Sequence, residues 1–245
     1  MLQRTKRSTY WPHFITKAFL LLGPLLGAFG VLQWSQTHST QVEDYARNLY
    51  PLWAVPLSRF SALFPFSLSE ALLYLLLLWV GSGLLYACVR VIMQRRIHAL
   101  ASWLWQTGCI ASLLISFFAV SWGIHYDRQP IEVTLQIQVE PAPVYELDML
   151  CGQLIQMANR LRMPDENMEW TPRVVLQQVD DAYQKARERW HFLPNGTWGN
   201  PKLVMASEVL SRMLIEGVYS PFTAESQING AIPGYTLPFT ACHEA

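Results

Sequence analysis

Apolar residues dominate the first half of the chain, whereas apolar and polar positions are mixed in the second half. Three apolar segments, residues 13–34, 68–93 and 100–123, reach the length of about 20 residues that a helix needs to cross a bilayer. Tryptophans lie near the ends of these segments, as in the aromatic belts of membrane proteins: Trp11, Trp34, Trp103 and Trp122. We therefore expect three transmembrane helices, with the lipid bilayer as a partner of the chain.

Basic residues near the helix ends predict the orientation, because loops rich in Lys and Arg stay in the cytoplasm. Three precede the first helix and three flank the short loop 94–99: Arg4, Lys6 and Arg7, then Arg90, Arg95 and Arg96. The longer loop 35–67 has only two, offset by acidic residues. We expect residues 1–12 and 94–99 in the cytoplasm, and residues 35–67 and 124–245 outside the membrane.

The first apolar segment has an alternative interpretation as a cleaved signal peptide. A basic start, an apolar core and small residues near Ala28 and Gly30 fit that pattern. The apolar run is long, however, and ends in Trp34 rather than in a clear A-x-A site, which favours an uncleaved anchor. Transporters place ionisable groups at mid-depth in the membrane, and none is evident here, so we interpret the three helices as an anchor.

The second half has the pattern of a small mixed domain. Residues 131–139 alternate apolar and polar positions, as in a half-buried strand. Two amphipathic helices are expected next, over residues 147–161 and from Thr171-Pro172 to Trp190. A short buried strand at residues 202–206, a short helix capped by Ser207, and two extended pieces around Pro221 complete an α+β domain.

Composition agrees with this division. Charged residues make up 15% of the chain, against about 25% in soluble domains, and the deficit lies almost wholly in the first half. The formal net charge is zero, and no basic stripe with interleaved aromatics is present, so we expect no nucleic-acid partner. The four cysteines form no C-x-x-C motif. The sequence allows a disulfide between Cys151 and Cys242 but does not decide whether it forms.

Candidate chemistry lies at the end of the sequence, LPFTACHEA (residues 237–245). His243-Glu244 is how the zinc-binding motif H-E-x-x-H begins. In that motif two histidines one helical turn apart bind Zn²⁺, and the glutamate takes a proton from zinc-bound water. The second histidine would fall two residues past Ala245. By itself, the dipeptide carries almost no information.

Its context carries more. The chain has three membrane segments, then FPFSLSE, PKLV, PFTAESQIN (residues 221–229) and LPFTACHE (residues 237–244), in that order. This arrangement resembles a bacterial family of uncharacterised membrane proteins, catalogued as a domain of unknown function, that look like zinc metallopeptidases. Typical members carry PFTGEANVN and LPFTACHELAHQ. The resemblance covers essentially the whole chain.

The resemblance implies a zincin-like extracytoplasmic domain on a bacterial plasma membrane. His243 would be the first zinc ligand and Glu244 the general base. The extended segment beside the cleft would be the edge strand to which a peptide or protein substrate adds as a further strand: Glu225, Ser226, Gln227, Ile228 and Asn229.

The sequence departs from the family at its last residue, where Ala245 stands in place of leucine, and the later zinc ligands have no counterpart. We therefore expect a membrane α-helical anchor of three spanning helices followed by an α+β zincin-like domain that is C-terminally incomplete and leaves apolar surface uncovered. Zn is expected in complete family members and not on this chain as given. The expected function is the N-terminal portion of a membrane-anchored zinc metallopeptidase, truncated inside its motif and inactive as given. The alternative is a non-catalytic extracytoplasmic binding or assembly module.

Overall fold

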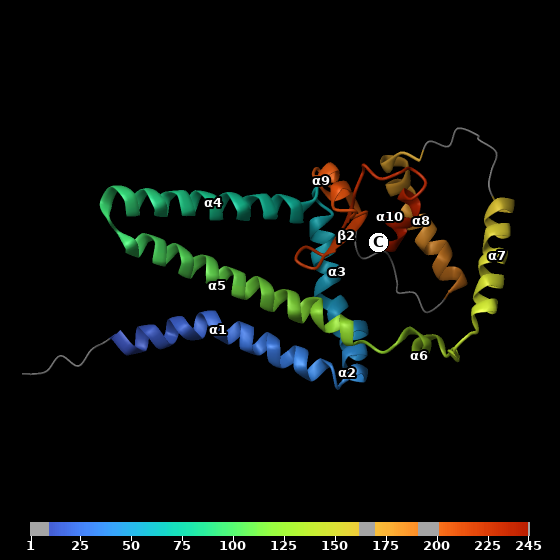
Figure 1. Ribbon diagram of the computed structural model, residues 1–245, viewed down its shortest axis with the longest axis horizontal. Helices are drawn as coiled ribbons and strands as arrows, with labels where there is room; N and C mark the ends of the chain where they lie inside the picture. Colours follow the sequence, from blue (N-terminus) through green and yellow to red (C-terminus); the bar gives the residue numbers. More distant parts are fainter. Residues whose placement is uncertain (1–9, 162–169, 191–200, 245) are drawn as a thin grey trace, which may run out of the picture.

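The computed structural model describes residues 10–161, 170–190 and 201–244. Its longest elements are the helices α1 (Tyr10–Ser35), α4 (Leu68–Gln94) and α5 (Ile97–Ser121), which extend in the same direction from the rest of the chain (Figure 1). α5 packs against both α1 and α4. All three are long and apolar enough to cross a membrane, so the expected membrane helices are present. All three Lys and Arg residues of the expected cytoplasmic segment 1–12 lie outside the described residues.

The segment between α1 and α4 is helical rather than a loop. It consists of α2 (Ser39–Asp44), a π-helical turn η1 (Tyr45–Leu49) and α3 (Tyr50–Ser61). α3 runs across the ends of α4 and α5 in Figure 1. Leu52 and Phe60 on α3 are more than half exposed, whereas Tyr50 and Ala54 are buried against Ala224 from the second half of the chain. α3 therefore connects the three long helices to the rest of the protein.

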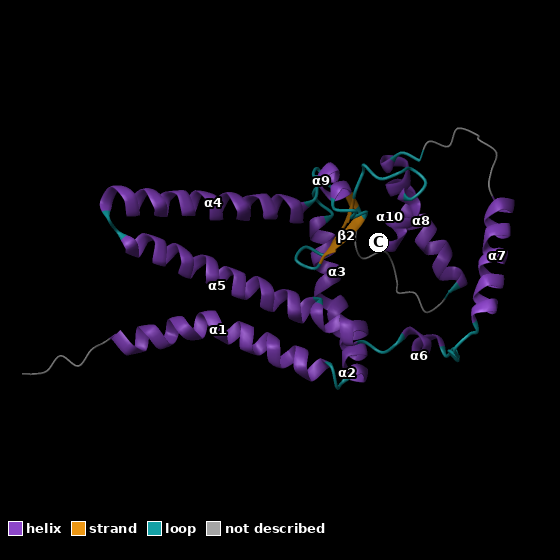
Figure 2. Ribbon diagram, viewed as in Figure 1, coloured by secondary structure: helices purple, strands orange, loops and turns teal. Residues whose placement is uncertain are grey.

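A three-stranded mixed sheet lies beside α3 (orange in Figure 2). Its strands are β1 (Lys202–Leu203), β2 (Gly217–Ser220) and β3 (Glu225–Ile228), in the order β1-β3-β2. β3 is parallel to β1 and antiparallel to β2. The short helix α9 (Ser207–Arg212) connects β1 to β2. The expected extended pieces on either side of Pro221 are therefore β2 and β3.

A small core forms where α8 (Pro172–Arg189) and α10 (Leu237–Glu244) meet the sheet. It contains five buried residues: Val175, Val179, Ile228, Leu237 and Ala241. Thr171 stands at the N-cap of α8, as expected, but its side chain makes no capping hydrogen bond. The cap of α9 is Ala206 rather than the expected Ser207.

The strand predicted over residues 131–139 is wrong. After the 3-10 turn η2 (Gly123–Asp127), residues 131–135 form the short helix α6 (Ile131–Leu135), and residues 136–143 have no regular structure. Alternation marks a strand only where a neighbouring strand offers backbone partners, and the described part of the chain offers none here. Ile131 and Val133 are accordingly more than half exposed.

Helix α7 (Val144–Leu161) forms where an amphipathic helix was expected. Leu147, Leu150 and Leu154 on its apolar face are each about half exposed, so apolar surface is left uncovered there. All four cysteines are free thiols, and Cys151 and Cys242 are therefore not paired.

Candidate functional site at the sheet and the last helix

The central strand β3 separates two environments, because successive side chains of a strand point to opposite faces of the sheet. On one face, Glu225 and Gln227 bond to the turn between α3 and α4. On the other face, Ser226 bonds to α10 and Ile228 packs in the core with α8 and α10. The strand therefore connects the membrane helices to the helix that carries His243 and Glu244.

On the first face, Glu225 and Lys202 form a buried ion pair. The Lys202 Nζ lies 2.6 Å from the Glu225 Oε1, and Lys202 also donates to the backbone carbonyls of Ser61 and Phe66. The Glu225 carboxylate is fully buried. It also accepts hydrogen bonds from the backbone N–H groups of Leu68 and Ser69 and from a hydroxyl, that of Thr223.

These donors determine the ionisation of Glu225. Burial raises the pKa of this carboxyl, but the Lys202 ammonium, the backbone N–H groups of Ser69 and Leu68 and the Thr223 hydroxyl together hold its pKa below the ordinary value. The two N–H groups belong to the start of α4, where the first donors of a helix lack partners within the helix. Glu225 therefore satisfies the N-terminus of a membrane helix from a distant strand.

A second carboxylate connects α4 to β1. Ser67 caps α4 by accepting a hydrogen bond from the Glu70 N–H. The Glu70 carboxylate, which is buried, accepts two backbone hydrogen bonds of 2.8 Å, from Met205 and Ala206. Gln227 donates to the Ser67 hydroxyl at 2.7 Å. The segments FPFSLSE, PKLV and PFTAESQIN therefore meet in one polar cluster.

On the second face lies α10, whose last turn carries His243 and Glu244. The His243 ring is exposed and stacks on Phe239 within the helix. Ser226 donates to the backbone carbonyl of Glu244, and Thr240 donates to Glu216, just before β2. These bonds fix the last turn of α10 against the sheet.

The Glu244 side chain lies against β2. A Cβ added to Gly217 would stand 2.6 Å from the Glu244 Cγ, so the absence of a side chain at position 217 makes room for this carboxylate. Burial raises the pKa of Glu244, and the His243 charge opposes this effect.

The described residues do not make a zinc site. Over residues 10–161, 170–190 and 201–244, no three His, Cys, Asp or Glu side chains gather closely enough to hold a metal ion. A catalytic zinc needs three protein ligands, and α10 contributes one histidine. The site residues predicted from the sequence lie on and just after β3 and in the last turn of α10, which contacts β3.

The interpretation of residues 225–229 as an edge strand is wrong. β3 lies between β1 and β2: β2 pairs with all four residues of β3 and β1 pairs with Gln227 and Ile228, so β3 is the central strand of this sheet. Within the described chain the outer edges of the sheet belong to β1 and β2. Of these two strands, β2 is the one that α10 contacts.

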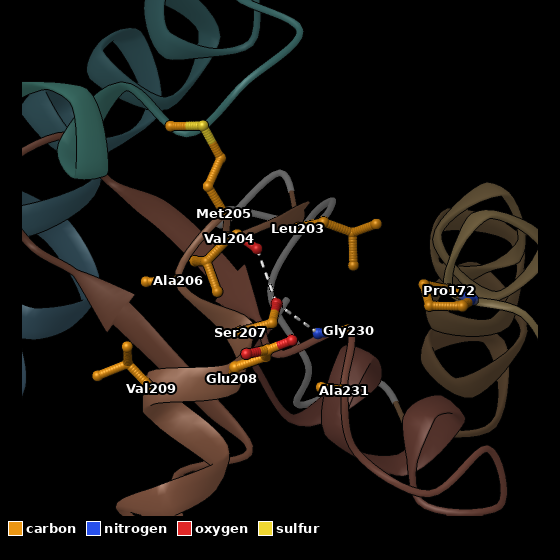
Figure 3. Close-up of a pocket in the computed structure, with 10 residues that line it drawn as sticks. All are labelled: Pro172, Leu203, Val204, Met205, Ala206, Ser207, Glu208, Val209, Gly230 and Ala231. Atoms are coloured by element: carbon orange, nitrogen blue, oxygen red, sulfur yellow. Dashed lines mark hydrogen bonds between the residues drawn. The ribbon is translucent and has the colours of Figure 1, made fainter.

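A separate pocket of about 550 Å³ lies between the first turn of α8 and the start of α9. Figure 3 shows that the Ser207 hydroxyl donates to the Val204 carbonyl at 2.7 Å and accepts from the Gly230 N–H at 3.0 Å. The lining is mainly apolar, with Glu208 as its one ionisable residue, and includes neither His243 nor Glu244. This pocket therefore carries no part of the candidate chemistry.

The roles of Lys202 and Glu70 in this polar cluster were not predicted from the sequence. Both left a signal in the sequence. A lysine opens the apolar run KLVMA, and Ser67-Leu68-Ser69-Glu70 has the spacing of a capping box. Neither signal indicates the partner: Lys202 pairs with Glu225, 23 residues away, and the bonds of Lys202 to Phe66 and of Glu70 to Met205 span more than 130 residues.

Comparison with protein families places the chain in a family. The family model described as "Protein of unknown function (DUF3810)" matches residues 45–245. No curated protein and no solved structure matches the chain.

Proposed function

The chain belongs to this family of unknown function, and on that premise we propose that it is the N-terminal portion of a membrane-anchored zinc-dependent metallopeptidase. His243 is the first zinc ligand and Glu244 the general base. The observation that carries the proposal is the contact of Glu244 with Gly217: it brings the carboxylate on the last turn of α10 to the edge strand of a mixed sheet. The raised pKa of Glu244 is consistent with the role of a base.

The substrate strand is assigned to β2 in place of β3. Within the described residues β2 pairs on one side only, with β3, and an extended peptide adds to such a free edge through backbone hydrogen bonds. A peptide bound there passes beside Glu244. The sheet and α10 lie outside a bacterial plasma membrane in this proposal, with residues 1–12 in the cytoplasm.

The residues present do not complete a zinc site, so no chemical step is assigned to the metal here. We expect the 245-residue chain to bind well under one zinc per molecule and to hydrolyse no peptide. The other ligands would come from residues that this sequence does not include.

The first test is the nucleotide sequence that follows codon 245 in the genome. A reading frame that continues the motif, with a histidine two positions beyond Ala245, supports the proposal. Unrelated sequence in every frame contradicts it and favours the alternative, a non-catalytic binding or assembly module.

The second test measures zinc in the purified full chain by elemental analysis, beside the His243→Ala variant. Equal, low zinc in both is expected. One tightly held zinc per chain that is lost in His243→Ala would show that the described residues form a metal site after all, and would contradict the proposal that the site needs further ligands.

A further inference from the structure

The turn between β2 and β3, residues 221–224, lies against a membrane helix. The Phe222 ring stacks on Phe117 of α5 at 5.5 Å between centroids and on Phe118 at 6.5 Å. Both partners belong to the apolar segment that is able to cross the membrane. In Figure 1 a turn beside β2 reaches past α3 toward α5. The sheet therefore touches the membrane segment directly, through this turn.

A second contact places Tyr219 of β2 at the membrane boundary. Its ring stacks on Trp122, which follows the last residue of α5, at 4.9 Å. Its hydroxyl lies 2.9 Å from that of Tyr50 at the start of α3. Trp and Tyr are the side chains that gather at the headgroup level of a bilayer, and three of them meet here.

Strand geometry limits the distance of β2 from this boundary. Gly217 is two residues from Tyr219, or about 7 Å at about 3.3 Å per residue. The headgroup layer on each side of a bilayer is itself about 5–8 Å deep, the difference between the hydrocarbon core and the full thickness. Whatever direction β2 takes, the stretch from Tyr219 to Gly217, where Glu244 lies, therefore extends no further from this boundary than about the depth of the headgroup layer.

Hydrogen bonds and packing contacts hold the sheet close to this boundary. Glu225 is bonded to the first N–H groups of α4, and Lys202 to carbonyls at the end of α3 and in the turn that follows. Ala224 is buried against Tyr50 and Ala54 of α3. These contacts join β1 and β3 to the end of α3 and the start of α4 and so hold the sheet close to the membrane helices.

The outer edge of β2 offers polar backbone groups at this level. The Asn229 N–H donates to the Glu216 carbonyl, and pairs in an antiparallel ladder alternate between bonded and non-bonded. The backbone groups of Gly217 and Tyr219 therefore point away from β3. Val218 between them is 36% exposed.

We infer that the segment bound at the β2 edge is an extended stretch of a membrane-anchored polypeptide, held within a few residues of the bilayer surface. A freely diffusing peptide is not its natural partner. This inference rests on the proposed function, since it names the substrate class of the same edge.

The test uses the full chain in phosphatidylcholine vesicles, with the photoreactive residue benzoylphenylalanine in place of Val218. Val174 on α8, 38% exposed, is the matched control position, because it is a valine of similar exposure away from the β2 edge. The probes are randomised ten-residue peptides in three forms: joined directly to a two-chain lipid anchor, joined through a 30-residue Gly/Ser spacer, and without an anchor. A fourth probe, anchored directly but N-methylated at alternate residues, cannot pair as a strand.

We expect cross-linking at position 218 to be at least about tenfold stronger with the directly anchored peptide than with the free one, since tethering gives millimolar effective concentrations. The 30-residue spacer spreads the peptide over about 30 Å and should weaken cross-linking severalfold. N-methylation should abolish cross-linking at position 218. At position 174 the four probes should not differ in this way.

Equal cross-linking by free and anchored peptides, or a spacer without effect, would overturn the inference and leave the proposed function intact. Cross-linking at position 218 no stronger than at position 174 would overturn the assignment of β2 as the binding edge, and with it the inference. The peptidase proposal itself is judged separately, by the sequence after codon 245.

Discussion

Replacing Lys202 by Met should destabilise the outer part of the protein substantially. The substitution replaces the apolar stem of the lysine by one of similar length but leaves the fully buried Glu225 carboxylate without its cation. Breaking a buried ion pair by removing one partner costs about 3–5 kcal/mol. Three other donors, the N–H groups of Leu68 and Ser69 and the Thr223 hydroxyl, stay in place, so we expect about 3 kcal/mol.

The assay is denaturant unfolding of the full chain in non-ionic detergent, followed by tryptophan fluorescence. Lys185→Met on α8 is the matched control, because Lys185 is exposed and makes no buried pair, and it should change stability by less than about 0.5 kcal/mol. Glu225→Gln should cost less than Lys202→Met, because an amide oxygen still accepts from the start of α4. The double variant should be more stable than the sum of the two losses predicts, by at least about 1 kcal/mol.

The pH dependence has a defined sign. The pKa of Glu225 in the folded chain lies below its ordinary value of 4.5, so its contribution is complete above pH 4.5 and is lost as the pH falls through the folded pKa. The difference between the wild-type chain and Glu225→Gln should therefore shrink in acid. Wild-type stability in Lys202→Met, or single losses that simply add, would refute the description of Glu225 and Lys202 as a coupled buried pair.

Three further predictions concern other contacts. The hydrogen bond from Arg128, helped by Arg47, lowers the pKa of Glu43 to about 2. Glu43→Gln should therefore lower the free energy of unfolding by about 1–2 kcal/mol at pH 7, a modest loss because both arginines are about half exposed. The difference in stability between the wild-type chain and this variant should disappear as the pH falls from 4.5 to 2. A loss that persists at pH 2 would contradict this origin. Gly217→Ala should cost about 1–3 kcal/mol by crowding, and Glu244→Ala in the same chain should relieve most of it; an unrelieved loss would point to the backbone instead. A phosphatase active only outside the cytoplasm should be active when fused after Ala245 and inactive in loop 94–99, and the reverse pattern would overturn the proposed orientation.

Local patterns were enough to predict the elements that are determined locally. A helix that crosses a membrane satisfies its own backbone hydrogen bonds, so the run from Leu68 to Gln94 needs no partner to be recognised. The amphipathic pattern likewise predicted α7 and α8. The same locality explains the error at residues 131–139, because a strand exists only with a neighbour, and alternation carries no information about one.

The pairing of β3 could not be read from the sequence for the same reason. PFTAESQIN predicts an extended segment, but its place between β1 and β2 depends on strands formed elsewhere. The role of Glu225 is set by Leu68 and Ser69, 157 and 156 residues away. The sequence alone therefore does not show whether Glu225 lies beside a substrate cleft or caps a membrane helix; the hydrogen bonds to Leu68 and Ser69 show that it caps the helix.

The bonds between the α3–α4 turn and the sheet also bear on whether the protein can be divided. Residues 124–245 have the composition of a soluble domain, which invites their production as a secreted fragment. In such a fragment Lys202 would lose the carbonyls of Ser61 and Phe66, and Glu225 would lose its two backbone donors from α4. The Lys202 and Glu225 charges, which are buried in the whole protein, would then be exposed on the lower surface of the sheet without these partners. The smallest unit able to fold like the whole protein therefore begins before α3, in the segment that joins the first two membrane helices.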